Sequence, residues 1–232
     1  MSRTLSTIGF DADDTLWHNE AIFKLTEEQF RGMLADYAAP ETIANRLVEA
    51  ERRNLGHYGF GVKGFTLSMI ETAIEVTSGK VPAATIKEII EAGRAMLTHP
   101  VETLPGVHDT LEALAPDYSL VLITKGDLFD QERKLAQSGL GDWFDGVEIV
   151  SDKTPEVYAR IFGGMAGGVD AAMMVGNSVK SDVIPAIEAG SIGVHVPHEH
   201  SWALEHAEAP VDSVRFHRIE TLDALPELIS GF

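Results

Sequence analysis

The stretch TIGFDADDTLWHNE, residues 7–20, joins a short apolar run to three aspartates within four positions. The apolar run has the length and composition of a buried β-strand. Three aspartates follow it, Asp11, Asp13 and Asp14. Their negative charges repel one another unless a cation lies nearby or the side chains have different roles and directions. An Asp-rich turn of this kind forms a cap as often as a site when it stands alone, so the rest of the chain must decide.

Four more apolar runs of strand type follow later in the chain. They are residues 120–124, 147–150, 172–175 and 192–196. Helical patterns occur among them at residues 105–115, 127–137 and 155–165. Strands that alternate with crossover helices predict an α/β fold with a doubly wound, Rossmann-like parallel sheet.

Residues 17–100 separate the first strand from the second and contain no clear strand. Four helical patterns lie there, at roughly 20–37, 41–55, 65–78 and 83–97. An insert of about 80 residues is far longer than an ordinary connection between a strand and a helix. We therefore expect an α/β core from residues 1–16 and 101–232, with a helical domain from residues 17–100. The glycine-rich segment 56–65 is expected to form a loop within that domain, either a surface turn between helices or a loop that contacts the substrate.

Composition and charge narrow the class of protein. The chain has 232 residues, a formal net charge of −18 and no cysteine, which excludes disulfides, thiolate catalysis and cysteine-ligated zinc. A strongly acidic chain disfavours a nucleic-acid polymer or an anionic membrane as its partner. No apolar run is long enough to span a membrane, and the N-terminus lacks the long apolar segment of a signal peptide, so we expect a cytoplasmic protein.

Polar residues that follow the strands are expected to converge, because ligands bind beyond the carboxyl ends of the strands in an open parallel sheet. These residues are Asp11, Asp13, Thr124, Lys153, Asn177 and Asp182. Carboxylate and amide oxygens suit Mg²⁺, whereas the Thr124 hydroxyl and the Lys153 ammonium suit phosphate oxygens. Together they predict a phosphoryl-transfer site.

Four segments carry a resemblance to a known family. FDADDT, Thr124 in LITKGD, Lys153 in SDKTPEVY, and VGNSVKSD occur in the order and approximate spacing of the four motifs of the haloacid dehalogenase-like hydrolase superfamily. The helical insert resembles the cap domain of that superfamily. The resemblance covers residues 7–196, and the four motifs together are far more specific than any one.

The resemblance implies a catalytic role for four residues. Asp11 is expected to attack phosphorus and become an aspartyl-phosphate. Asp13 is expected to protonate the leaving oxygen and later to activate water. Thr124 and Lys153 are expected to hold the transferring phosphoryl group. An acid at position 13 points to phosphate esters, because the dehalogenase and phosphonatase branches lack it.

The resemblance also implies a Mg²⁺ site formed by Asp11, the backbone carbonyl of Asp13, Asn177 and Asp182. Asn177 stands where the family commonly has an acid, which removes one negative charge from the site. We expect weaker Mg²⁺ binding than an aspartate at that position would give.

The function predicted from these residues is a Mg²⁺-dependent phosphatase that acts on a small phosphorylated metabolite. A phosphomutase of the β-phosphoglucomutase type remains a close alternative, because the phosphoryl group could return to a sugar instead of to water. A family member that binds ligands without catalysis is a further alternative, which Asn177 favours. A receiver-like signalling module is disfavoured, because a stable phosphoaspartate gains nothing from an adjacent hydrolytic base. The sequence leaves the oligomeric state and the particular phosphate ester open.

Some charged residues receive a structural interpretation. Asp14 is expected to cap or to hydrogen-bond, because an extended chain turns its side chain away from Asp11 and Asp13. Lys125 and Lys180 are expected to be exposed. The histidine-rich segment 196–208 matches no zinc signature and is expected to be a surface excursion with Trp202 and Leu204 packed down.

Overall fold

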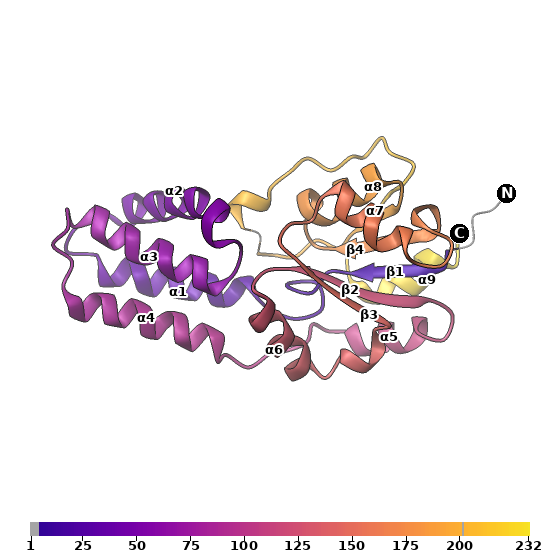
Figure 1. Cartoon of the computed structure of the whole chain (residues 1–232), viewed down its shortest axis with the longest axis horizontal. Helices are drawn as coiled ribbons and strands as arrows, with labels where there is room; N and C mark the ends of the chain where they lie inside the picture. The colour runs from indigo at the N-terminus through magenta and orange to yellow at the C-terminus, as the bar shows by residue number, and fades with distance from the viewer. Residues whose placement is uncertain (1–4, 201) are drawn as a thin grey trace. The chain divides into compact units, whose positions relative to one another are not determined.

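A computed structural model describes residues 5–200 and 202–232, in which six strands form one parallel sheet (Figure 1). The strands are β1 (Thr7–Phe10), β2 (Ser119–Lys125), β3 (Gly146–Val150), β4 (Ala172–Gly176), β5 (Ile192–His195) and β6 (Phe216–Arg218). Their order is β3-β2-β1-β4-β5-β6, and every neighbouring pair is parallel. The predicted doubly wound α/β sheet is confirmed.

The first strand, β1, lies in the interior of the sheet, where it pairs with β2 on one side and β4 on the other. Each of its four residues is buried. Gly9 is required by close packing, because a Cβ atom there would lie 2.9 Å from side-chain carbons of both Ile123 and Phe162. The residue after β1, Asp11, therefore starts from a rigid and fully buried position.

Helices cover both faces of the sheet and complete two hydrophobic clusters. Ile8 and Phe10 belong to the cluster that includes residues of α5 (Val107–Leu114) and α9 (Leu225–Ile229). Alternate residues of the neighbouring strands point the other way, into a cluster with α7 (Pro155–Gly163) and α8 (Ile184–Ala189) (Figure 1). Helix α6 (Leu128–Ser138) connects β2 to β3.

The chain forms two compact units. The α/β unit comprises the described residues up to Glu20, Val101–Lys125 and Gln131–Phe232, and the helical unit comprises Ala21–Pro100 and Gly126–Asp130. The α/β unit thus continues past residue 16, where the sequence places its first boundary. The short segment Gly126–Asp130 joins the helical unit instead of the α/β unit, with Lys63 Nζ 2.8 Å from Asp127 Oδ2.

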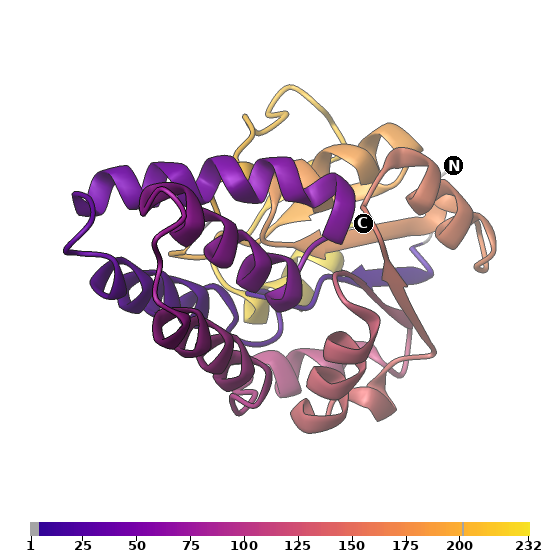
Figure 2. The ribbon, with the colours of Figure 1, turned by 60° about the vertical axis from the view of Figure 1, so that its left-hand side comes forward.

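The helical unit is built on four long helices. They are α1 (Glu20–Met33), α2 (Pro40–Tyr58), α3 (Val62–Val76) and α4 (Ala83–Leu97). Helix α2 packs beside α3, and α3 beside α4 (Figure 2). The apolar faces of the helices meet in a separate core that includes Phe30, Leu47, Met69 and Ile89. This unit therefore has its own hydrophobic centre.

The structure departs from the expected elements in two places of the helical unit. The segment 56–65 is mostly helical: α2 continues to Tyr58 and α3 begins at Val62, which leaves Gly59–Gly61 as the connection. The first helix ends at Met33, four residues before the expected end at 37. Two of the four glycines in 56–65 thus lie within helices, where helix contacts override their weak helix propensity.

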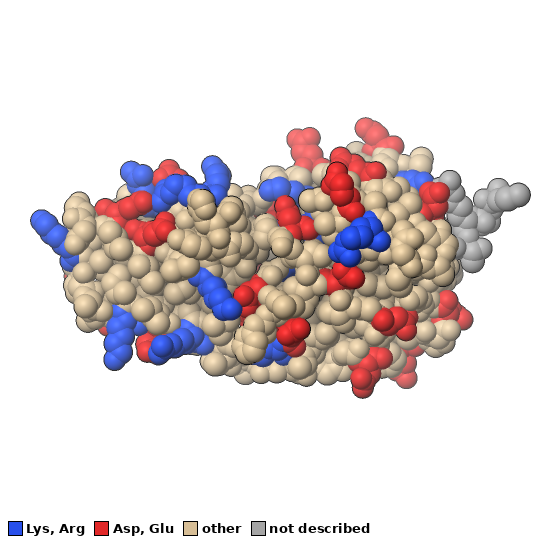
Figure 3. Space-filling model, in the orientation of Figure 1, with Lys and Arg blue, Asp and Glu red and all other residues tan. Residues whose placement is uncertain are grey.

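Charge is distributed unevenly over the face drawn in Figure 3. Asp and Glu side chains outnumber Lys and Arg over the α/β unit in that view, whereas both signs occur over the helical unit. A small anion that binds the α/β unit therefore needs a positively charged group close to its binding site. Among the described residues, no helix is long and apolar enough to cross a membrane.

Candidate active site

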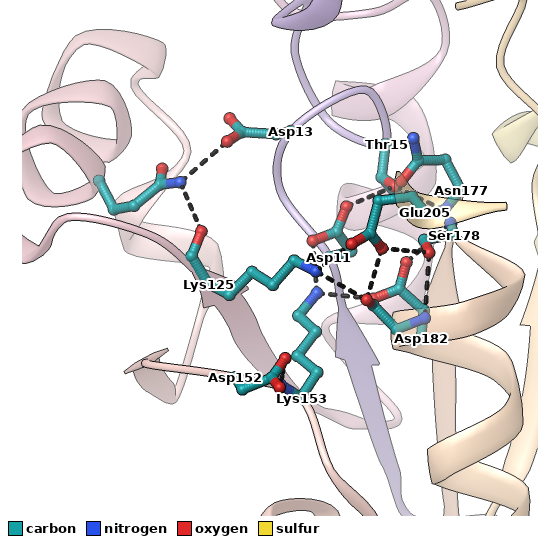
Figure 4. Close-up of polar contacts among 12 residues, drawn as sticks. Asp11, Asp13, Thr15, Lys125, Asp152, Lys153, Asn177, Ser178, Asp182 and Glu205 are labelled. Carbon is teal, nitrogen blue, oxygen red and sulfur yellow. Dashed lines mark hydrogen bonds and ion pairs between the residues drawn. The ribbon is translucent and has the colours of Figure 1, made fainter. Parts of the chain in front are cut away.

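The site begins at Asp11, directly after β1, where its buried carboxylate is held from two sides (Figure 4). Lys153 Nζ donates to Asp11 Oδ1 at 2.5 Å, and the Thr15 hydroxyl donates to Asp11 Oδ2 at 3.0 Å. Burial raises the pKa of Asp11 to about 7, against the opposing effect of the Lys153 charge. A carboxylate with this environment is fixed in place and poorly solvated, as a nucleophile must be.

Lys153 joins Asp11 to a second buried carboxylate. Its ammonium also lies 2.6 Å from Asp182 Oδ1, and the side chains of Lys153 and Asp182 are each only 1% exposed. Burial lowers the pKa of Lys153, but the two carboxylates more than compensate and raise it above its ordinary value. The lysine is therefore a permanent cation at this end of the sheet.

Local structure fixes Lys153 and the second carboxylate that it contacts, Asp182. Lys153 immediately precedes α7, whose N-terminus is formed by Thr154, which accepts from the Val157 N–H, and by Pro155 at the first helical turn. Asp182 lies in a π-helical turn, Val179–Val183, and its Oδ2 accepts from the Ser178 N–H at 2.9 Å.

Glycine at position 176 leaves room for this arrangement. A Cβ atom on Gly176 would collide with the carboxylate of Asp182. The next residue, Asn177, donates its backbone N–H to the Thr15 hydroxyl at 3.0 Å. Thr15 thus connects the turn after β4 to Asp11, and Asn177 lies beside Thr15 in Figure 4.

Thr124 reaches the same edge of the sheet. Phe10 of β1 pairs with Leu122 of β2, so Asp11 and Thr124 both lie beyond that pair, toward the carboxyl ends of their strands. Thr124 is buried. The structure therefore brings Asp11, Thr124 and Lys153 to one end of the sheet, as parallel strands require.

Asp13 belongs to a separate set of contacts. Its carboxylate accepts from Trp17 Nε1 at 2.7 Å, from Gln131 Nε2 at 2.9 Å and from Lys134 Nζ at 3.0 and 3.1 Å. Burial alone would raise its pKa, but Lys134 and these hydrogen bonds hold the pKa below its ordinary value. Figure 4 shows the Asp13 carboxylate pointing away from that of Asp11. The predicted acid–base group is therefore held as an ion by its neighbours.

Sequence reasoning missed the helix residues that hold Asp13. Gln131 and Lys134 are three positions apart on α6, so they lie on one face of that helix. Lys134 Nζ also donates to Asn19 Oδ1 at 2.7 Å. Their i, i+3 spacing was visible in the sequence, but nothing local indicated which acid they would meet.

Asp14 performs the predicted capping role. Its carboxylate accepts from the backbone N–H groups of Asn19 and Glu20, at the start of α1, with shortest distances of 2.9 Å. Asp14 itself has a left-handed backbone, with φ 61°, which aspartate tolerates better than most residues. His198 Nδ1 lies 3.7 Å from Asp14 Oδ1. Asp14 thus caps the start of α1 and takes no part in the hydrogen bonds described for Asp11 and Asp13.

Glu205 is the second feature that sequence reasoning missed. Its Oε1 lies 2.6 Å from Lys125 Nζ, and its Oε2 accepts from the hydroxyls of Ser178 at 2.7 Å and Ser181 at 2.5 Å. Burial raises its pKa, but Lys125 and the hydroxyls hold the pKa below its ordinary value. The segment 196–208 is therefore more than a surface excursion, although Trp202 and Leu204 are partly buried as expected.

The expectation that Lys125 is exposed was wrong. Its side chain is 15% exposed, because Glu205 and Ser181 surround the ammonium. Lys180 is exposed as expected, and its ammonium donates to the backbone carbonyl of Leu204. The only local sign of the Lys125 pair is that a lysine directly after a buried strand needs a counter-charge.

The donor atoms around Asp11 suit a hard cation. Carboxylate and amide oxygens from Asp11 and Asn177 are the ligands that Mg²⁺ accepts, usually with water and substrate oxygens. Both oxygens of Asp182 already accept from Lys153 and Ser178, so its role as a ligand stays a prediction. Within residues 5–200 and 202–232, no three His, Asp or Glu side chains are grouped as a metal site.

The chain is an α/β protein with a buried aspartate–lysine pair at the carboxyl ends of its parallel strands. The chain belongs to the haloacid dehalogenase-like hydrolases, whose family model matches residues 5–190. A crystal structure of a haloacid dehalogenase-like family hydrolase from Xanthomonas campestris is 40% identical, with a TM-score of 0.89, over 99% of this chain and 92% of that one. The family resemblance of the four motifs is thereby confirmed.

More distant relatives carry different activities. A pyrimidine 5′-nucleotidase, PynA of Streptococcus pneumoniae, is 34% identical over 96 residues, which span 38% of this chain and 40% of that protein. Two solved structures match the fold at TM-scores of 0.68: Bacillus subtilis YfnB bound to magnesium, at 16% identity over 97% of this chain and 99% of that one, and an L-2-haloacid dehalogenase from Xanthobacter autotrophicus, at 18% identity over 99% and 100%. The fold is therefore shared by hydrolases of more than one kind.

Proposed function

We propose that this protein is a phosphatase that hydrolyses a small phosphomonoester through an aspartyl-phosphate on Asp11. The observation that carries the proposal is the contact between the Asp11 carboxylate and the buried Lys153 ammonium, at 2.5 Å. A fixed carboxylate beside a permanent cation can attack phosphorus while the cation neutralises charge on the phosphoryl oxygens. The acid at position 13 and the partial match to a nucleotidase support a phosphate ester as the substrate.

In the first half of the reaction, an oxygen of Asp11 forms a bond to phosphorus as the bond to the leaving oxygen breaks. Thr15 holds the other oxygen of Asp11, which fixes the direction of attack. Thr124 and Lys153 hold the phosphoryl oxygens. Asp11 and Asn177, with backbone and water oxygens, would hold Mg²⁺, which would supply positive charge that reduces repulsion between the carboxylate and the phosphate.

In the second half, water attacks phosphorus and regenerates the Asp11 carboxylate. Asp13 is suited to accept the proton of that water, because its neighbours keep it ionised. To protonate the leaving oxygen in the first half, the Asp13 carboxyl must first bind a proton and leave Lys134. The helical unit acts, in this proposal, as a cap that limits the access of water.

Hydrolytic dehalogenation is a second candidate. The engagement of Asp13 by Lys134, Gln131 and Trp17 favours it, because displacement of a halide from carbon needs no proton donor to the leaving group. Asn177 favours it as well, since a reaction without a phosphate anion needs less cationic charge. In that case Asp11 would attack carbon and form an ester.

A panel of substrates tests the proposal. Sugar phosphates, nucleoside monophosphates and 2-chloropropionate are incubated with the purified protein, with Mg²⁺ or with a chelator, and free phosphate and chloride are measured. Phosphate release that needs Mg²⁺ and is lost in Asp11→Asn supports the phosphatase. Chloride release supports dehalogenation, an isomerised sugar phosphate supports a phosphomutase, and unchanged turnover in Asp11→Asn overturns the assignment of the nucleophile.

A further inference from the structure

The contacts of Glu205 have the form of an anion-binding site. One carboxylate accepts from the Lys125 ammonium at 2.6 Å and from the hydroxyls of Ser178 at 2.7 Å and Ser181 at 2.5 Å. The same donors bind phosphate and carboxylate groups of ligands. Glu205 therefore occupies the place that a bound anion would take.

These donors come from the end of β2 and from the turn after β4, next to residues of the candidate catalytic centre. Lys125 directly follows Thr124, and Ser178 directly follows Asn177. The backbone of Ser178 holds Asp182, whose other oxygen contacts Lys153. The site of the Glu205 carboxylate is thus linked to Lys153 by two hydrogen-bonded residues (Figure 4).

The segment that delivers Glu205 is held in a way that permits its release. It is a single short 3-10 turn, Ala203–Glu205, and it belongs to no strand or long helix. Its polar side-chain contacts include the three donors to Glu205 and the Lys180 ammonium on the Leu204 carbonyl. A competing anion on Lys125, Ser178 and Ser181 would replace the hydrogen bonds that hold the Glu205 side chain.

We propose that Lys125, Ser178 and Ser181 form a subsite for a second anionic group of the substrate, a carboxylate or a second phosphate, and that Glu205 fills this subsite until the substrate displaces it. The substrate class rests on the proposed phosphatase function. The subsite limits the expected substrates to phosphate esters that carry a further negative charge. Glu205 then acts as an internal competitor that lowers the affinity for every such substrate.

Binding of non-hydrolysable probes tests the subsite without depending on turnover. Phosphonoacetate and 3-phosphonopropionate carry a phosphonate and a carboxylate at two separations, whereas methylphosphonate carries the phosphonate alone. Their dissociation constants are measured calorimetrically, at one Mg²⁺ concentration, for the wild type and for Glu205→Ala. We expect Glu205→Ala to bind at least one of the two carboxylated probes about tenfold more tightly, with little change for methylphosphonate.

Two further variants separate the subsite from a general effect of charge. Glu208→Ala removes an exposed acid from the same segment and is expected to leave all three affinities unchanged. Adding Lys125→Met to Glu205→Ala is expected to abolish the gain. The proposal is overturned if Glu205→Ala gains for neither carboxylated probe, if methylphosphonate gains equally, or if Glu208→Ala reproduces the gain. Because the test measures binding and not turnover, it decides the subsite proposal even if the protein proves not to be a phosphatase.

Discussion

Lys134 and Asp13 form an ion pair across 121 residues of sequence, with the Lys134 ammonium 3.0 and 3.1 Å from the two carboxylate oxygens. Both side chains are largely buried, at 11% and 23% exposure. The pair fixes the charge and the direction of the carboxylate for which the motif resemblance predicts an acid–base role. Control of that group therefore involves a helix that carries none of the four motifs.

Replacement of Lys134 by methionine should destabilise the protein in a pH-dependent manner. The pKa of Asp13 is held below 3.8, so the pair stabilises the fold above that pH and loses its effect as the pH falls through the lowered value. We expect the free energy of unfolding to fall by about 2 kcal/mol at pH 7. Urea denaturation between pH 7 and pH 3 measures this, with Arg133→Met on the same helix as the matched control. A loss that stays constant below pH 3.8 would contradict the ion pair as its origin.

Replacement of Lys153 by methionine should remove both activity and stability. We expect turnover to fall by about 10³-fold, because no cation then offsets charge on the phosphoryl group. The pKa of Asp11 is already raised to about 7, so ionisation of this residue opposes folding as the pH rises through that value. Without Lys153 the loss of stability should be larger at pH 8 than at pH 5, which thermal unfolding at the two pH values measures. An equal loss at both would show that Asp11 is not the group left unpaired.

Replacement of Asn177 by aspartate should strengthen Mg²⁺ binding. The added carboxylate would restore the charge that the family commonly has at this position, beside Thr15 and Asp11. We expect an affinity about tenfold higher by isothermal titration calorimetry, and Asn177→Ala should bind more weakly than the wild type. Identical affinities in the three proteins would remove residue 177 from the metal site.

Replacement of Asp14 should affect stability according to whether a cap survives. Asp14→Ala loses the acceptor for the N–H groups of Asn19 and Glu20 and keeps an unfavourable positive φ. We expect a loss of about 1 to 2 kcal/mol in the free energy of unfolding, measured by chemical denaturation. Asp14→Asn retains an acceptor and tolerates the left-handed conformation, so it should cost less than half as much. A similar loss in the two variants would show that charge, not capping, is the dominant effect.

Apolar runs were sufficient to predict five of the strands, of which four lie in the interior of the sheet and β3 at its edge. The sixth strand, Phe216–Arg218, was missed because it has only three residues and two of them are basic or polar. Helix α8 was missed for a similar reason: it has six residues and follows directly from a π-helical turn. Short elements depend on tertiary contacts more than on local pattern.

The motif residues could be predicted, but their partners could not. Strand ends converge at one edge of a parallel sheet, so the sequence alone was sufficient to predict that Asp11, Thr124 and Lys153 lie together. Lys134 and Glu205 reach the site from a helix and from a turn after the last predicted strand. Several acids lie in the segment around Glu205, and the sequence has no period that selects one of them. Such pairs depend on how loops pack, which local propensity does not encode.

The interior position of β1 has a consequence for synthesis of the chain. Its two partner strands begin at Ser119 and Ala172, so the ribosome must release most of the protein before Thr7–Phe10 is paired on both sides. Helices α1 to α4 follow β1 in the chain but precede both of its partner strands, and their apolar side chains meet in a core of their own. Asp11 is thus translated before both partner strands of β1 and acquires its native surroundings only after they have emerged.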